Sequence, residues 1–124
     1  MNIIISNSSQ KPIYEQIMDQ IKDHIIKGQL KELEPLPSIR SLAKDLQISV
    51  ITTKRAYDEL EKEGFIVTIA GKGSFVAAQN KELLRESRLK IVEEKIYEAV
   101  QAAKSAELTY PELAEMLKIF FEEV

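Results

Sequence analysis

Two short amphipathic segments, separated by only three residues, constrain this sequence more than any other feature. Over residues 39–46 and again over residues 50–62, apolar residues recur at helical spacing, and a serine that can cap a helix stands directly before each segment. The link between them is Gln47-Ile48-Ser49. Two short helices joined by so tight a link are typical of a helix-turn-helix, which the sequence therefore predicts here.

The flanking segments extend this motif. Isoleucines recur at helical spacing over residues 12–27, after a proline that suits the first turn of a helix. Beyond the third helix, β-branched and aromatic residues over 65–69 and 74–77 predict two strands joined by a tip at residues 70–73. We therefore expect a mainly α-helical fold with a small β-hairpin, in the arrangement of a winged helix-turn-helix.

A second helical region follows the hairpin. Apolar residues return at helical spacing from residue 81 to about residue 104, and Thr109-Tyr-Pro-Glu112 then has the pattern of a capping box with proline in the first turn. These signals predict a C-terminal two-helix hairpin. The chain should divide into a winged helix-turn-helix domain, residues 1–78, and a helical dimerisation region, residues 79–124.

The composition limits the chemistry open to this chain. Hydrophobic residues make up 44% of its 124 residues and charged residues 30%, as in an ordinary globular protein. There is no cysteine, and His24 is the only histidine. Because no ligand set of known spacing and no nucleophile with a nearby base can be found, we expect no enzyme activity, no metal and no cofactor. The first residues lack a basic leader, so a cytoplasmic protein without a membrane anchor is expected.

The net charge of -3 argues weakly against nucleic-acid binding, but the charges are unevenly distributed. Residues 1–78 carry 10 basic and 10 acidic residues, whereas residues 79–124 carry 7 basic and 10 acidic ones. Within residues 36–56, four cationic residues stand against one acidic residue. Since phosphate binding needs a local basic face and not a basic chain, DNA binding remains open.

The first turn of the third predicted helix holds the best candidates for DNA contact, because an α-helix fits the major groove and its N-terminal residues reach base edges. These candidates are Ser49, Thr52, Thr53 and Lys54. In the first turn of the preceding helix, Arg40 could clamp a phosphate or read a guanine. Simpler interpretations stay open, since Ser49 could serve only as a cap and Thr52 or Arg40 only as solvated surface residues.

The tip of the hairpin reads Gly71-Lys72-Gly73. Glycines permit close backbone approach, and the lysine can neutralise a phosphate or enter a minor groove. A plain hairpin turn is the alternative. A phosphate-binding P-loop is excluded because Ile66 stands where its first glycine is needed.

Taken together, the motifs resemble those of the GntR family of bacterial transcriptional regulators. The matching segments are Pro12-Ile-Tyr-Glu-Gln-Ile17, Leu36-Pro-Ser-Ile-Arg-Ser-Leu-Ala43, Lys54-Arg-Ala-Tyr-Asp-Glu-Leu-Glu61, Glu63-Gly64 and Gly71-Lys-Gly-Ser-Phe-Val76. The short helical tail is similar to the YtrA subfamily, in which two helices serve for dimerisation. The resemblance implies that Arg40, the helix start at Ser49, Thr52 and Lys54, and the wing tip face DNA.

Three departures from the family pattern stand out. Glu32-Leu33 replaces the usual Pro-Gly, which predicts a different loop shape, and Gln47 replaces the usual glycine of the turn. Val50, Ile51 and Ile69-Ala70 replace residues that are commonly polar or basic. We expect these changes to lower affinity for DNA and to make methyl contacts to thymine more prominent.

The C-terminal helices carry more apolar residues than one hairpin can bury. Leu89, Val92 and Ile96 are expected to close on Leu113, Leu117 and Phe120. A second copy of the chain would then cover Ile91, Val100, Ile119 and Phe121. The alternative is that the hairpin folds back on the winged domain in a monomer.

The sequence thus predicts a DNA-binding transcription regulator, more often a repressor in this family, that binds an inverted-repeat operator in double-stranded DNA as a homodimer. The alternative is a winged-helix module for protein–protein interaction without DNA binding. The sequence identifies neither the operator nor a small-molecule effector.

Overall fold

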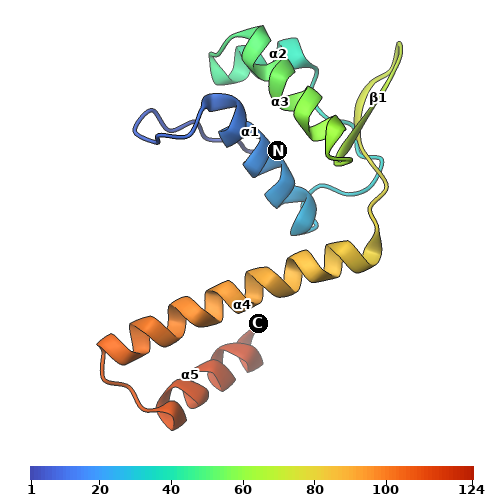
Figure 1. Ribbon diagram of the computed structural model, residues 1–124. Helices are drawn as coiled ribbons and strands as arrows, with labels where there is room; N and C mark the ends of the chain where they lie inside the picture. Colours follow the sequence, from blue (N-terminus) through green and yellow to red (C-terminus); the bar gives the residue numbers. More distant parts are fainter. The chain divides into compact units, whose positions relative to one another are not determined.

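The computed structural model describes all residues from 1 to 124 and is mainly helical with one antiparallel two-stranded sheet, which confirms the predicted fold class (Figure 1). Its elements are α1 (Ile13–Ile26), α2 (Ile39–Leu46), α3 (Val50–Lys62), β1 (Ile66–Ile69), β2 (Gly73–Val76), α4 (Lys81–Ser105) and α5 (Tyr110–Glu123). The chain divides into two compact units, Met1–Leu84 and Arg85–Val124. The predicted boundary after residue 78 lies between β2 and α4, and the roles assigned to the two parts remain predictions.

One hydrophobic core holds the N-terminal unit together. It receives side chains from α1, α2, α3, both strands and the N-terminal segment. The largest fully buried side chains are Ile17, Ile21, Leu60, Val76 and Thr53. Burying a side chain of this size stabilises a fold by about 1.5–3 kcal/mol, so this core fixes α2 and α3 against α1.

The helix-turn-helix forms as predicted, with both serine caps in place. Ser38 Oγ accepts a hydrogen bond from the Ser41 amide, and Ser49 Oγ accepts one from the Thr52 amide. Between the helices, Gln47 has φ 57°, in the left-handed region. The amides of Gln47 and Ile48 bond to the carbonyls of Lys44 and Ala43, closing α2 as a glycine would normally do.

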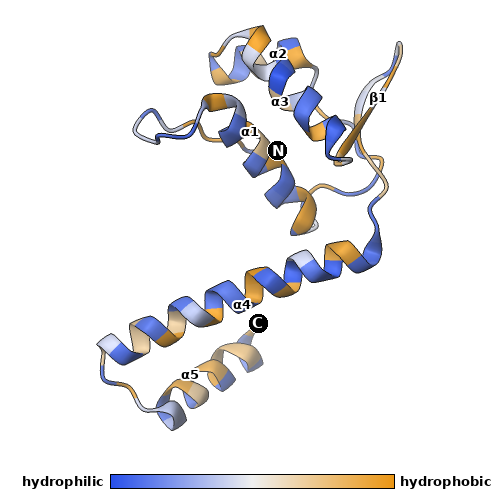
Figure 2. Ribbon diagram, in the orientation of Figure 1, coloured by the Kyte–Doolittle hydropathy of each residue, from blue (hydrophilic) through white to orange (hydrophobic).

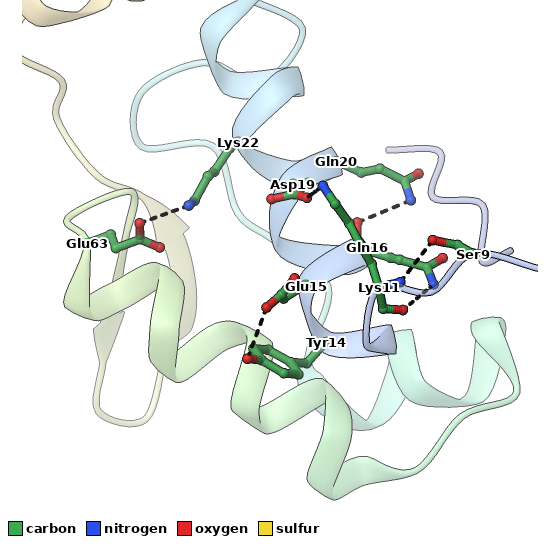
Figure 3. A network of polar contacts seen from close by, with 9 residues as sticks. All are labelled: Ser9, Lys11, Tyr14, Glu15, Gln16, Asp19, Gln20, Lys22 and Glu63. Atoms are coloured by element: carbon green, nitrogen blue, oxygen red, sulfur yellow. Dashed lines mark hydrogen bonds and ion pairs between the residues drawn. The ribbon is translucent and has the colours of Figure 1, made fainter. Parts of the chain in front are cut away.

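Two glutamines of α1 bind the N-terminal segment to the helix, and Figure 3 shows one of these bonds, from the Gln16 side chain to Lys11. The Gln20 side chain accepts from the Ile4 amide at 2.8 Å and donates to the Ile4 carbonyl at 2.7 Å. Gln16 makes the same pair of bonds with Ser6 and also donates to the Lys11 carbonyl. The two side-chain amides thus pair with the backbone of the N-terminal segment as the backbone of a neighbouring strand would.

The wing has a third segment beside its two strands. Strand β1 pairs with β2, and the loop before α2 lies against β2 through a bridge between Pro35 and Phe75. In this loop Leu33 has φ 64° and is 70% exposed. Leucine therefore adopts here a conformation that glycine adopts without strain.

The C-terminal unit is built from α4 and α5, and local signals set its turn. At the end of α4, Glu107 has φ 60°, and the Leu108 amide bonds to the Ala103 carbonyl. The predicted capping box is present, because Thr109 Oγ1 accepts from the Glu112 amide while the Glu112 carboxylate accepts from the Thr109 amide. The chain then turns back along α5 (Figure 1).

The apolar faces of α4 and α5 do not close on each other, which corrects the expectation from the sequence. The two helices do not pack along their length, and hydrophobic residues recur along both of them (Figure 2). Of the six residues expected to meet, Leu113 is half-buried, whereas Leu89, Val92, Ile96, Leu117 and Phe120 are exposed. Ile91 and Val100 are half-buried, and Ile119 and Phe121 are exposed.

The reason is that contact between α4 and α5 is limited to the turn. Val100, Ala103, Leu108 and Leu113 meet there, and a cavity of ≈ 150 Å³ remains between them. Ala103 is the only residue of the two helices that is buried. No helix of the protein combines the length and the apolar character that crossing a membrane requires.

Candidate nucleic-acid interface

The start of α3 is the centre of the candidate interface. Ser49 Oγ accepts from the Thr52 amide at 3.0 Å and donates to Thr52 Oγ1 at 2.8 Å. Ser49 therefore acts as a cap, and its hydroxyl proton is already used within the turn. Thr52 is half-buried, and its own hydroxyl proton remains available to a ligand.

Thr53 does not belong to this surface. Its relative exposure is 0%, and its hydroxyl donates to the Ser49 carbonyl at 3.0 Å. A side chain without exposed surface cannot reach a base, so the expectation that Thr53 contacts DNA is corrected. The threonine instead fills the core beneath the first turn of α3.

Both helices of the motif carry exposed cations. Arg40 and Lys44 on α2 are exposed and have no carboxylate partner. Lys54 Nζ lies 2.7 Å from Asp58 Oδ2, in an ion pair whose side chains are more than half exposed. Such a pair contributes little to stability, so Lys54 can exchange its partner for a phosphate at small cost.

The position of Arg55 could not be read from the sequence. Its guanidinium lies 3.8 Å from the centre of the Tyr14 ring on α1, a cation–π contact. The carboxylate one turn further along, Glu59, pairs with Lys62 instead. Tyr14 thus holds Arg55 on the second turn of α3, and no local spacing signals a contact between residues so far apart in the sequence.

The wing tip places one cation on a tight turn. Gly71 and Gly73 have φ 75° and 108°, which explains both glycines by turn geometry alone. The Lys72 amide bonds to the Ile69 carbonyl at 2.9 Å, and the Lys72 side chain is exposed without an ion-pair partner. Lys72 is therefore the group at this tip that a phosphate can contact.

The remaining chemistry is structural. His24 Nδ1 donates to the Gln20 carbonyl at 2.5 Å within α1. Tyr57 is buried and donates to the Pro37 carbonyl at 2.7 Å, and burial raises the pKa of its phenol. No group of three or more His, Asp or Glu side chains is placed to hold a metal ion.

Comparisons with known proteins match the chain to a family and to solved structures. The model of "Bacterial regulatory proteins, gntR family" matches residues 13–76. The chain is 35% identical to the HTH-type transcriptional repressor YtrA of Bacillus subtilis, over 94% of this chain and 89% of that protein. It is 32% identical to a solved structure of YtrA from Sulfolobus acidocaldarius, a GntR-family transcription factor, with a TM-score of 0.60 over 98% of each chain.

A third similarity is confined to the fold. The DNA-binding domain of AraR, solved in complex with operator ORX1, is 22% identical to this chain, with a TM-score of 0.55. The match covers 62% of this chain and 96% of that domain.

Proposed function

This chain belongs to the GntR family of bacterial regulatory proteins, and we propose that it is a repressor that binds an inverted-repeat operator as a homodimer. As a member of this family it is a transcription regulator with a winged DNA-binding domain and not an enzyme. The symmetry of the operator, the homodimer, repression as opposed to activation, and the residues that contact DNA are all proposed here. We also propose a cytoplasmic location, where the protein meets the DNA that it binds.

The observation that carries DNA binding is the set of exposed cations on the two helices of the motif and on the wing. Arg40 and Lys44 lie on α2, Lys54 lies near the start of α3, the helix end that fits a major groove, and Lys72 stands at the tip of the wing. In this reading Ser49 and Thr52 position the turn, and Gly71 and Gly73 shape the tip. The AraR domain, whose fold this chain shares, was solved on operator DNA, and this supports the same use of the fold.

The dimer is supported by the uncovered apolar faces of α4 and α5. We define the C-terminal apolar strip as the exposed residues Leu89, Val92, Ile96, Leu117, Ile119, Phe120 and Phe121. Apolar surface gains roughly 25 cal/mol per Å² on burial, so an interface of standard size, about 800 Å² on each partner, can offset the entropy lost on association. A two-fold axis would present two α3 helices to two half-sites, so the operator should be an inverted repeat.

Selection of bound sequences from a random pool of duplex DNA tests both parts of this proposal. We expect recovery of an inverted repeat, and with that duplex Lys54→Ala and Arg40→Ala should each weaken binding without unfolding the protein. Each lost phosphate contact should also flatten the salt dependence of binding by about one unit of slope. Lys62→Ala, at the far end of the same helix, is the matched control.

The wing is tested separately with Lys72→Ala and Lys72→Glu. Substituting Gly71 is less informative, because any side chain is strained at its φ of 75°. Both lysine variants should bind more weakly than wild type, the glutamate more so because it places a like charge against phosphate. If the wild-type protein recovers no sequence from the pool, the hypothesis of DNA binding is replaced by the alternative, a winged-helix module for protein–protein interaction.

A further inference from the structure

The first turn of α3 presents apolar side chains at the point where the proposed DNA site needs base contacts. Val50 is 48% exposed and Ile51 is 82% exposed. Ile51 lies nine positions before the buried Leu60, about two and a half helical turns, so the two side chains point to opposite sides of α3. Ile51 therefore takes no part in the core.

The fold gives no reason for isoleucine at this position. A β-branched residue loses side-chain freedom in a helix and is a poorer helix former than alanine. At 82% exposure it gains little from packing in return. An exposed isoleucine at the start of α3 is therefore free to be covered by a ligand.

The polar groups of the same turn leave little capacity for reading bases by hydrogen bonds. The Ser49 hydroxyl donates to Thr52 Oγ1, and the Thr53 hydroxyl donates to the Ser49 carbonyl. Among the side chains of residues 49–53, only the Thr52 hydroxyl still has a free proton. Recognition by this turn must therefore depend largely on apolar contact.

The surrounding charges indicate what covers Ile51. Lys54 is an exposed cation on the second turn of α3, and Arg40 and Lys44 are exposed cations on α2, the other helix of the motif, so the motif carries charges that suit the phosphates of a duplex. A duplex held by them would bring the start of α3 to the base edges of the major groove. The apolar group that a base pair presents there is the 5-methyl group of thymine.

We propose that Ile51 is a specificity-determining residue that contacts the 5-methyl group of a thymine, so that the protein selects an A·T pair at that position of each half-site. The inference rests on the proposed DNA binding and adds to it which base feature is read and by which side chain. Val50, less exposed and one position earlier, borders the same contact.

The test removes the methyl group from the DNA and its partner from the protein. The duplex recovered from the random pool is resynthesised with each thymine of one half-site replaced in turn by deoxyuridine, which keeps base pairing and loses only the methyl. Wild-type protein should bind about fourfold more weakly at one or two positions, the effect of one buried carbon. For Ile51→Ala, the same replacement should change affinity by less than twofold.

A matched control separates this contact from general effects of losing an exposed isoleucine. Ile4 is 70% exposed on the N-terminal segment, and Ile4→Ala should retain the full wild-type sensitivity to deoxyuridine. If no deoxyuridine replacement lowers the affinity, or if Ile51→Ala responds to the replacements as the wild type does, Ile51 does not contact a thymine methyl group. DNA binding itself would not be contradicted by either result. If the pool yields no bound sequence, the proposed function itself fails.

Discussion

The two units of this protein treat their apolar residues in opposite ways. In Met1–Leu84, side chains from three helices and both strands of the wing meet in one core, and residues such as Ile17 and Leu60 have no exposed surface. In Arg85–Val124, the helices are equally regular, yet Ala103 alone is buried. Regular helices therefore do not by themselves indicate a packed unit.

The difference shows which forces act in each region. The C-terminal helices have strong local signals, among them a capping box and proline at the start of α5. Each such signal is worth only about 1 kcal/mol, and most helical stability in proteins comes from the packing of an apolar face. Since the C-terminal apolar strip has no cover within the chain, a second copy would supply the missing packing.

The largest expected effect is loss of self-association on removal of residues 85–124. The full chain should sediment as a dimer at micromolar concentration, whereas residues 1–84 should be monomeric because the C-terminal apolar strip is gone. The shortened chain should still unfold cooperatively, since its core is complete without the tail. A full-length protein that is monomeric at micromolar concentration would contradict the proposed dimer.

A pair of leucine substitutions sharpens the same contrast. Leu60→Ala removes a side chain with 0% exposure and should lower the free energy of unfolding by about 3 kcal/mol, through lost burial and the cavity left behind. Leu117→Ala, on the exposed face of α5, should leave the unfolding of the N-terminal unit unchanged and raise the dissociation constant of the dimer. Chemical denaturation measures the free energy of unfolding, and sedimentation at decreasing concentration measures the dissociation constant. An equal loss of unfolding free energy in both variants would show that Leu117 is packed within the chain as Leu60 is.

Tyr57→Phe tests a buried polar contact that the C-terminal unit lacks. Loss of the hydrogen bond to the Pro37 carbonyl should cost about 1–2 kcal/mol near neutral pH. Burial raises the pKa of the Tyr57 phenol, so above about pH 10 the unfolded state loses this proton before the folded state does and wild-type stability falls. The variant lacks that loss, so the gap between the two proteins, measured by urea unfolding, should narrow as pH rises above 10. A gap that stays constant would show that Tyr57 ionises equally in both states.

The smallest expected effect compares the two helix ends that lack glycine. Gln47 closes α2 and Glu107 closes α4, both at positive φ. Glycine at either position should relieve backbone strain and raise stability by about 0.5–1 kcal/mol after its own entropy cost. Gln47→Gly should raise the melting temperature of the full chain and of residues 1–84, whereas Glu107→Gly can act only in the full chain. A lower melting temperature for Gln47→Gly would mean that this turn is not strained.

Local chemistry was enough to predict the elements of this protein. The helix over Val50–Lys62 and the capping box of Thr109 and Glu112 were correct because a cap, a stop and apolar spacing act over a few residues. The winged helix-turn-helix followed from the order of these elements. The family could be predicted as well, because its motifs are short segments that can be recognised in the sequence one after another.

What the sequence left open depended on contacts between distant residues. Arg55 and Tyr14 meet because α1 packs against α3, and no local spacing signals that contact. Thr53 is different, because it stands seven positions before Leu60 and so on the same side of α3, and the helical period alone could have placed it on the buried face.

The C-terminal helices are the clearest case. Their periodicity correctly placed the apolar residues on the helices, but it could not tell whether the two faces meet within one chain. That depends on the angle set by the turn at Glu107 and Leu108, where a few backbone dihedrals decide the direction of the whole of α5. Element identity is a local property of this sequence, whereas burial is decided by how the elements are brought together, because the free energy of burial belongs to pairs of surfaces and not to single residues.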